Sequence, residues 1–213
     1  HPKKNGNLTP DKIGPNSGKR VWWKCPKGDD HVWKANVRNR HHGLGCPICS
    51  NQMVARSNCL ATLRPDLAKQ WHPDKNGKLT PYDVVPGSGR NVWWQCPQGK
   101  DHVWRATPNK RSAGKGCPIC IGRKVVDSNS FLTLHPELAA ELHPTKNGRL
   151  DPNKYRPYSN KTVWWKCPNG DDHAWKTSFN MRVQGTGCPR CNSAKSAPEL
   201  RVYCELNSIF PGT

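Results

Sequence analysis

Hydrophobic and polar residues alternate in two neighbouring runs, and this pattern occurs at three places in the chain. The run 21–26 begins Val-Trp-Trp, and such β-branched and aromatic residues are typical of strands. In the run 31–37, Trp33, Ala35 and Val37 alternate with polar residues, so one face packs and the other meets water. A short turn separates the two runs. The pattern therefore predicts a β-hairpin with one buried face.

A different pattern follows each predicted hairpin. A Gly-x-Gly-Cys-Pro-x-Cys turn closes the unit, and a polar segment comes after it. We expect one short helix at 57–71 and its equivalent at 128–142, with Pro65 and Pro136 in the first turn of the helix proper, where proline is tolerated. After Cys191 the pattern changes, and it predicts a helix of another type.

The patterns recur with a period of 71 residues, as the steps from Cys25 to Cys96 and from Cys96 to Cys167 show. Self-similarity at a fixed period indicates an array of modules. We predict repeats at 1–71, 72–142 and 143–195, with 196–213 as the start of a further, truncated domain. Only 34% of the residues are hydrophobic, so each repeat buries too little apolar surface to be stable without an additional link.

Three cysteines and one histidine supply that link, because every repeat contains them at the spacing C-x5-H-x14-C-x2-C. Structural zinc takes four ligands in a tetrahedron, and Cys3His is one of its usual sets. Thiolates favour zinc over magnesium or calcium, with iron as a minor alternative. Four protein ligands leave no position for water, so we expect structural zinc and no enzymatic role for this chain. The predicted ligands of three zinc ions are Cys25, His31, Cys46, Cys49, Cys96, His102, Cys117, Cys120, Cys167, His173, Cys188 and Cys191.

Disulfides in a secreted protein are the alternative use of the eleven cysteines. The odd number, the histidine in each set and the lack of a visible signal peptide or membrane-length apolar run argue against it. We therefore expect a reducing, intracellular location and no membrane association. Cys59 and Cys204 lie outside the repeated spacing, and we expect them to be packing residues.

The net charge of +19 suggests a polyanionic partner, with a merely soluble basic protein as the alternative. Cations that recur in all three repeats are candidates for phosphate contacts, although each could also be a solvated charge. These residues are Lys4, Lys75 and Lys146; Lys19, Arg90 and Lys161; Lys34, Arg105 and Lys176; and Arg40, Arg111 and Arg182.

The residues around Arg40, Arg111 and Arg182 change between repeats, while the spacing of the recurring residues stays the same. Such an arrangement could hold a nucleic-acid backbone at fixed positions and read base edges at variable ones, but surface drift explains the variation equally well. The variable candidates are Arg38, His41, His42, Lys115 and Gln184.

Tryptophans also recur, and the first repeat has Trp22, Trp23 and Trp33. Neighbouring residues of a strand point to opposite faces, so both members of the adjacent pair cannot enter one core. We expect Trp33 and one of the pair in the core. The other is a candidate surface contact, where it could stack on bases.

Three motifs together resemble a known family. They are Val-Trp-Trp-x-Cys-Pro-x-Gly-x-x-His-x-Trp, then Arg-x-x-Gly-x-Gly-Cys-Pro-x-Cys, then Ser-Asn and a Pro-Asp/Glu-Leu-Ala helix start. This set is similar to a tandem zinc-ribbon, treble-clef-type repeat family of unknown function, and the resemblance implies zinc at the twelve ligands named above. The family often precedes a nuclease domain similar to very-short-patch-repair endonucleases. The tail 196–210 looks like the opening helix of such a domain, which implies a C-terminal nuclease domain in cis.

The predicted fold class is small α+β zinc-stabilised modules, namely three tandem zinc-ribbon or treble-clef-like units. Each has a β-hairpin with two zinc knuckles plus a short linking helix. We interpret the chain as a zinc-dependent DNA-binding array that acts as the targeting module of a larger protein, with double-stranded DNA as the expected partner. Binding of RNA or single strands, and a zinc-stapled scaffold for protein interactions, remain open alternatives.

Overall fold

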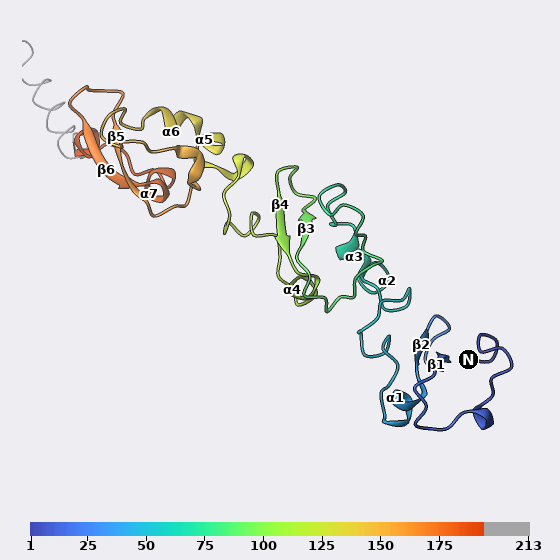
Figure 1. The fold of residues 1–213 in the computed structure, drawn as a ribbon. Helices are drawn as coiled ribbons and strands as arrows, with labels where there is room; N and C mark the ends of the chain where they lie inside the picture. Colours follow the sequence, from blue (N-terminus) through green and yellow to red (C-terminus); the bar gives the residue numbers. More distant parts are fainter. Residues whose placement is uncertain (194–213) are drawn as a thin grey trace, which may run out of the picture. The chain divides into compact units, whose positions relative to one another are not determined.

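Three two-stranded antiparallel hairpins organise the part of the chain that the structure, a computed structural model, describes, namely residues 1–193 (Figure 1). Residues 1–117 contain the first two hairpins, and the third lies in the part that begins at Pro118. The predicted helix after Cys191 that begins at Ser196, and Cys204, lie outside the described residues. The strands are β1 (Arg20–Lys24) and β2 (Val32–Asn36), β3 (Val92–Gln95) and β4 (Val103–Ala106), and β5 (Thr162–Lys166) and β6 (Ala174–Ser178). We call the segments around these hairpins the first, second and third modules.

The strand register separates the tryptophans of each module into two faces. In the first module Trp23 pairs with Trp33, and Trp22 pairs with Lys34. Directly opposed side chains lie on the same face of an antiparallel pair. Trp23 and Trp33 therefore share the inner face, whereas Trp22 and Lys34 share the outer face. The second and third modules have the same pairing.

A short helix follows each hairpin, where the sequence predicted a strand continuing to Val37. The helices are α1 (Val37–His41), α4 (Pro108–Ser112) and α7 (Phe179–Val183). The hydroxyl of Thr107 caps α4 by accepting a hydrogen bond from Lys110 N–H, and Ser178 caps α7 in the same way. Thr107 followed by Pro108 is a helix-start signal that could have revealed this element.

An asparagine binds the loop before each hairpin to the hairpin itself. It belongs to the segment His-Pro-x-Lys-Asn-Gly, which occurs in every module. Asn5 Oδ1 accepts a hydrogen bond from Trp22 N–H at 2.8 Å, and Asn5 Nδ2 donates to Trp22 O at 2.9 Å. The side-chain amide thus imitates a neighbouring strand. Gly6 has φ +56°, a left-handed conformation that favours glycine. Asn76 and Asn147 bind Trp93 and Trp164 in the same way.

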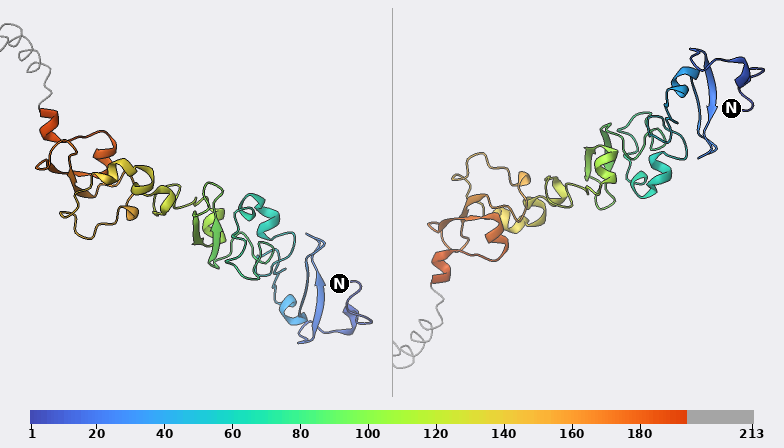
Figure 2. Two further views of the ribbon diagram at one scale, coloured as in Figure 1. Left: turned by 90° about the horizontal axis from the view of Figure 1, so that it is seen from above. Right: turned by 90° about the horizontal axis from the view of Figure 1, so that it is seen from below.

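The expected helices at 57–71 and 128–142 each form as a pair of shorter helices. The pairs are α2 (Leu60–Leu63) with α3 (Pro65–Ala68), and α5 (Phe131–Leu134) with α6 (Pro136–Ala140) (Figure 2). Arg64 and His135 break them with φ values of −139° and −140°, because a residue before proline avoids the helical region. Four short elements complete the described chain: η1 (Pro10–Lys12), η2 (Asp127–Asn129), η3 (Pro152–Lys154) and α8 (Pro189–Ser193).

Each helix pair packs on the hairpin that follows it in sequence. Trp71 forms a β-bridge with Trp94, and their rings meet edge to face at 5.5 Å. Leu60 N–H donates to Val84 O at 2.7 Å. Leu60 and Trp94 are fully buried as a result. The helix pair therefore completes the inner face of the second module.

The third module has an aromatic version of this packing. Phe131 of α5 lies 5.9 Å from Trp165 and 4.5 Å from Phe179, measured between ring centroids. Leu138 and Leu142 pack against the same cluster. In the first module, by contrast, the core consists of Cys25, Trp33, Cys46 and Ile48, and Trp23 is only half-buried beside it. The predicted class of small α+β modules is confirmed, and the modules differ in what covers their inner face.

Candidate metal centre

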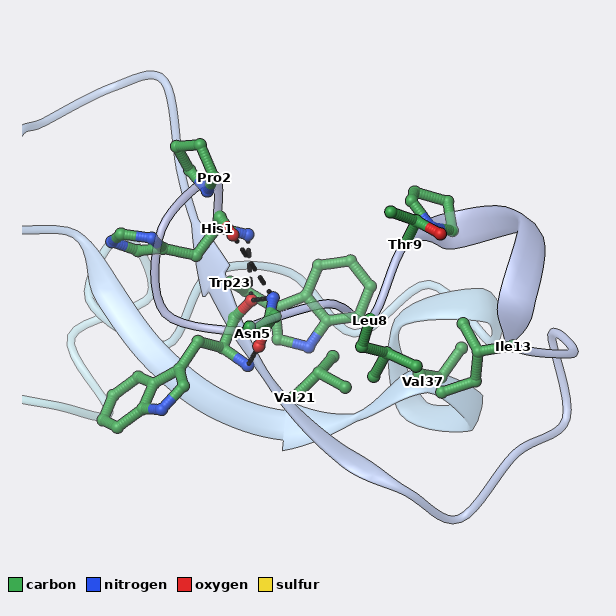
Figure 3. Close-up of a pocket in the computed structure, with 12 residues that line it drawn as sticks. His1, Pro2, Asn5, Leu8, Thr9, Ile13, Val21, Trp23 and Val37 are labelled. Carbon is green, nitrogen blue, oxygen red and sulfur yellow. Dashed lines mark hydrogen bonds between the residues drawn. The ribbon is translucent and has the colours of Figure 1, made fainter.

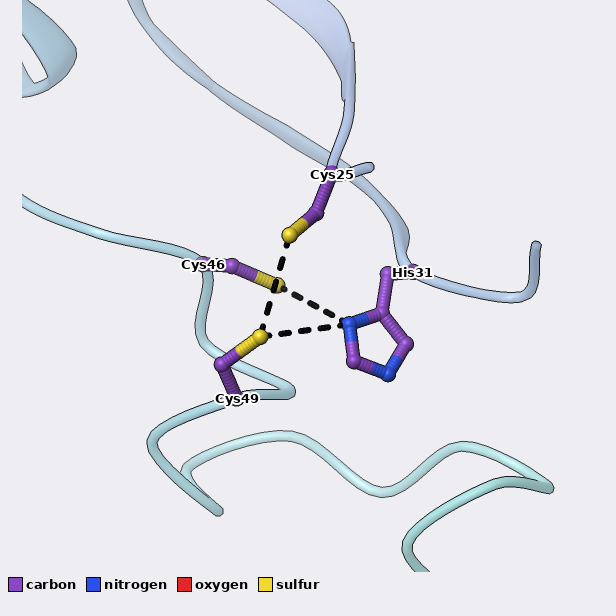
Figure 4. A group of neighbouring side chains, drawn as sticks. All are labelled: Cys25, His31, Cys46 and Cys49. Atoms are coloured by element: carbon purple, nitrogen blue, oxygen red, sulfur yellow. Dashed lines mark hydrogen bonds between the residues drawn. The ribbon is translucent and has the colours of Figure 1, made fainter. Parts of the chain in front are cut away.

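The four predicted ligands of each repeat come together in the structure. In the first module Cys25 follows β1, His31 precedes β2, and Cys46 and Cys49 lie on the second turn (Figure 4). Cys25 Sγ lies 3.7 Å from Cys49 Sγ, and His31 Nδ1 lies 3.7 Å from Cys46 Sγ and 3.3 Å from Cys49 Sγ. A tetrahedral zinc ion with ordinary bond lengths places its ligand atoms about 3.5–3.8 Å apart. The observed spacing thus suits zinc.

The other two tetrads repeat this arrangement, since all four ligand atoms of each set lie within 4.8 Å of one another. In the third module Cys167 and Cys191 have their sulfurs 3.6 Å apart, and His173 Nδ1 lies 3.8 Å from Cys188 Sγ. Disulfide bonds are about 2.05 Å long, so these sulfurs are free thiols. The twelve predicted ligands therefore form three Cys3His sets.

The loop between Cys25 and His31 owes its shape to a glycine. Cys25 N–H donates to His31 O at 3.0 Å, and His31 N–H donates to Gly28 O at 3.2 Å. A Cβ atom on Gly28 would lie 2.6 Å from His31 Cδ2, which is too close for any other residue. A Cβ on Gly99 would lie 2.7 Å from His102 Cδ2. The glycine thus lets the imidazole lie over the turn and direct Nδ1 at the sulfurs.

A comparison with protein families agrees with this geometry. A family model described as "Probable Treble clef zinc finger domain" matches residues 1–52, 67–123 and 138–194, which is most of the chain.

The chain belongs to this treble clef zinc finger family. Each matched segment contains one Cys3His set, so the predicted resemblance and the prediction of one structural zinc ion per repeat are confirmed. No curated protein matches the treble clef chain. Within residues 1–193, no helix has the length and apolar character needed to cross a membrane.

The treble clef ligands differ in proton affinity. A hydrogen bond from the backbone N–H of Lys27 lowers the pKa of Cys25 to about 7. Burial, with the neighbouring sulfurs adding to it, raises the pKa of Cys49 to about 11. Crowded thiolates repel one another, so a divalent cation is needed to hold three of them deprotonated in one site.

The histidine ligand has polar partners on the side away from the sulfurs. His31 Nε2 lies 3.1 Å from Ser57 Oγ and 3.9 Å from Asp30 Oδ1, and Asp30 also accepts a hydrogen bond from Ser57 N–H at 2.7 Å. Such partners fix the orientation of a metal-bound imidazole. Neither Asp30 nor Ser57 is part of the repeated ligand spacing that predicts the site. The aspartate that precedes the histidine in every repeat was the signal that could have found Asp30.

A recurring arginine lies against each tetrad, and Arg111 shows the arrangement most clearly. Arg111 is 5% exposed, and its guanidinium lies 5.3 Å from the ring centroid of Trp94 and 5.2 Å from that of Trp104. It donates to Lys115 O, and its Nη2 donates to Gln70 Oε1 at 2.6 Å. Burial lowers the pKa of Arg111, while the negative charges of the Cys117 and Cys96 thiolates act to raise it. The guanidinium is therefore held inside the module beside the sulfurs.

The Nε atoms of Arg40, Arg111 and Arg182 are all buried without a hydrogen-bond partner among the described residues. A zinc ion bound by three thiolates and a neutral imidazole carries a net charge of −1. A buried cation with a spare N–H donor fits such an anionic group. The buried Nε atoms therefore favour a place beside the tetrad for these three arginines, and their phosphate contacts stay a prediction.

The other candidate cations lie at the surface. Lys4 Nζ lies 4.7 Å from the ring centroid of Trp22, and Lys75 and Lys146 lie at 5.0 and 4.8 Å from those of Trp93 and Trp164. Arg105 and Lys176 cover the same outer tryptophans at 5.6 and 4.9 Å. Lys34 is exposed on β2 opposite Trp22. The remaining candidates are exposed and lie before the first strand or after the second: Lys19, Arg90, Lys161, Arg38, His41, His42, Lys115 and Gln184.

Proposed function

We propose that this treble clef chain is a tandem nucleic-acid-binding array that contacts the phosphates of duplex DNA with the outer faces of its hairpins. The outer face of a module is the half-buried tryptophan at position 22, 93 or 164 with the cations beside it. The observation that carries the proposal is that this tryptophan–cation cluster recurs in all three modules. The net charge of +19 is in keeping with it.

The geometry of the cluster favours phosphate contact over base stacking. In the third module Lys146 and Lys176 both lie over Trp164, at 4.8 and 4.9 Å. A cation over an indole ring gains about 0.5–1 kcal/mol at an exposed site. The lysines are therefore pre-positioned, and the ring surface that a base would need is already used. This supports duplex binding ahead of single-strand binding.

The covalent linkage of three modules supports the same reading. Each outer face offers few charges, so one module alone would bind weakly. Linked sites raise affinity by increasing the effective concentration of the second and third contacts. The four protein ligands of each tetrad leave the zinc in a structural role, and we propose no catalysis for this chain. In this proposal the array directs a larger protein, of which it is a part, to DNA. The expected partner domain in that protein is a nuclease domain in cis.

The salt dependence of DNA binding tests the proposal. A triple variant, Lys34→Gln, Arg105→Gln and Lys176→Gln, removes one outer cation from each module. The plot of log affinity against log salt for a 20–30 base-pair duplex should become shallower by about 1 for each phosphate that the variant no longer neutralises, or ~3 in all. A matched triple, Lys12→Gln, Lys69→Gln and Lys154→Gln, removes the same charge elsewhere and should change the slope much less.

Three results would contradict the proposal. Equal slopes for the two triple variants would mean that the outer faces are not the binding surface. Tighter binding of single strands or structured RNA than of duplex DNA in competition would favour the alternative partners. Wild-type affinity no greater than that of polylysine of similar charge would reduce the interaction to nonspecific attraction.

A further inference from the structure

An apolar groove of about 530 Å³ lies on the inner face of the first module (Figure 3). Its apolar lining comes from Leu8, Ile13, Val21, Trp23 and Val37. These side chains come from the loop before the hairpin, from the hairpin and from the first turn of α1. A groove of this size and composition can take several large apolar side chains.

The equivalent face of the second module is filled by its helix pair. Val84, Val92 and Trp94 stand where Ile13, Val21 and Trp23 stand in the first module, and they are 4%, 2% and 0% exposed. Leu60 and Leu67 of the helix pair are themselves 0% and 4% exposed. Trp71 Nε1–H donates to Leu79 O at 3.0 Å, and Leu79 is the counterpart of Leu8. The lining is thus the same, but here it is covered.

The third module repeats the covering with other side chains. Phe131 N–H donates to Tyr155 O at 2.7 Å, as Leu60 N–H donates to Val84 O. The Phe131 ring lies 4.5 Å from that of Phe179, the counterpart of Val37. Residues 1–193 contain these two helix pairs, and each is seated on the hairpin that follows it. Neither pair is therefore free to cover the first module.

The backbone of the first module is already arranged to continue into such a pair. His72 N–H donates to Trp93 O at 3.1 Å, directly after Trp71 has entered the core. The nitrogen of His1 donates to Trp22 O at 3.0 Å, which is the same bond at the equivalent place. A residue joined to His1 would therefore lie where Trp71 lies in the second module, at the mouth of the groove.

The arginine beside each tetrad needs a hydrogen-bond acceptor from the segment that covers the module. Arg111 binds Gln70, and Arg182 binds Glu141, so the residue before Trp71 or Leu142 carries an acceptor in both covered modules. Arg40 donates to Leu44 O within its own loop. An occupant of the first groove should supply the same acceptor to Arg40.

We propose that the groove of the first module is the seat of a helix pair of the α2–α3 type, joined to the nitrogen of His1. Its sequence carries Leu or Phe, then Leu, then Gln or Glu, then Trp or Leu, at the spacing of residues 60, 67, 70 and 71. The seating of the helix pair does not depend on nucleic acid. A helix pair that does not seat would therefore leave the proposed function standing, and a lack of DNA binding would leave the helix-pair proposal standing.

The test fuses a copy of residues 57–71 ahead of His1 in the full zinc-loaded chain. Hydrogen exchange of the Trp23 indole, which donates to Ala35 O at 3.1 Å, should slow by about tenfold or more, because the helix pair excludes water from this face. A control extension carries Ser at the positions that correspond to Leu60, Leu67 and Trp71. It should leave the exchange of Trp23 unchanged.

A groove variant completes the design. Ile13→Asp in the extended chain should remove the added protection while native mass spectrometry still finds three zinc ions. Equal protection by the two extensions would overturn the proposal, as would protection that survives Ile13→Asp. Protection of Trp23 that rises with protein concentration in the unextended chain would overturn it too, because a second copy would then fill the groove.

Discussion

The first and second modules share their ligand spacing and strand register but differ in how their inner faces are covered. Trp94 is fully buried under Trp71 and the α2–α3 pair, whereas Trp23 is half-buried beside a groove. The indole N–H donates to the opposite strand in both, from Trp23 to Ala35 O and from Trp94 to Ala106 O. The hairpin and its tetrad thus form the same geometry with or without the cover.

This difference separates two sources of stability. The tetrad ties together segments close in sequence, and every module has the same Cys3His set. The helix pair adds apolar burial from the preceding segment. The predicted repeat borders after residues 71 and 142 divide each pair from the hairpin that it covers, and they stay a prediction. Changes that touch zinc should therefore affect both modules, and changes that touch the cover should affect only the second.

Loss of a zinc ligand should have the largest effect. Structural zinc contributes on the order of 10 kcal/mol to the folding of such modules. Cys46→Ser should unfold the first module, and Cys117→Ser should leave some structure in the second because Leu60, Leu67 and Trp94 remain apolar and adjacent. Native mass spectrometry should count two zinc ions in each variant, and the tryptophan indole signals should report which hairpin is lost. Three retained ions in Cys46→Ser would contradict the assignment of the site.

Removal of an inner tryptophan should be the next largest effect, and it should be unequal. Trp94→Ala empties a fully buried site and should cost about 3–5 kcal/mol. Trp23→Ala removes a half-exposed ring and should cost roughly 1–2 kcal/mol, since less apolar area is lost. Urea unfolding at constant free zinc would measure both. Equal losses would mean that the helix pair adds nothing to the second module.

Replacement of the buried arginine should weaken zinc binding moderately. Arg111→Gln removes a cation beside the sulfurs and its bond to Gln70, and zinc affinity should fall by about tenfold. Arg40→Gln should have a smaller effect, because its guanidinium is less buried. The exposed Arg105→Gln is the control of equal charge. Competition with a chromophoric chelator gives the three affinities, and identical values would remove the arginine from the metal centre.

The smallest effect is expected at a loop carboxylate of the second module. The hydroxyl and then the backbone N–H of Thr80 lower the pKa of Asp83, so its stabilising effect is present above the unfolded pKa of about 3.9 and is lost as pH falls through the folded value. Asp83 is exposed, so solvent screens its charge, and Asp83→Asn should change stability by at most about 0.5 kcal/mol, equally at about pH 6 and pH 8. The first module uses Asp11 and Thr9 in the same way. A difference between the two pH values would point to another group.

The sequence predicted the parts of the fold that local spacing determines. Cys25, His31 and the hairpin between the turns follow from ligand chemistry and alternation, and the structure confirms them. Other features depend on contacts between distant residues. Arg111 recurs as a surface cation would, and only its burial between Trp94 and Trp104 identifies its place beside the sulfurs. Asn5 stands in an Asn-Gly pair, which by itself is typical of a turn, although its amide binds a strand 17 positions away.

Hydrogen exchange of the three inner indoles in the unmodified, zinc-loaded chain tests the central comparison most directly. Trp23, Trp94 and Trp165 each donate an indole N–H to the opposite strand at 3.1, 2.9 and 3.0 Å, so their hydrogen bonds are matched. Exchange should be fastest at Trp23 by about tenfold or more, because Trp94 and Trp165 lie under helix pairs. Equal rates at all three positions, or slower exchange at Trp23, would contradict the conclusion that the helix pair completes the treble clef module.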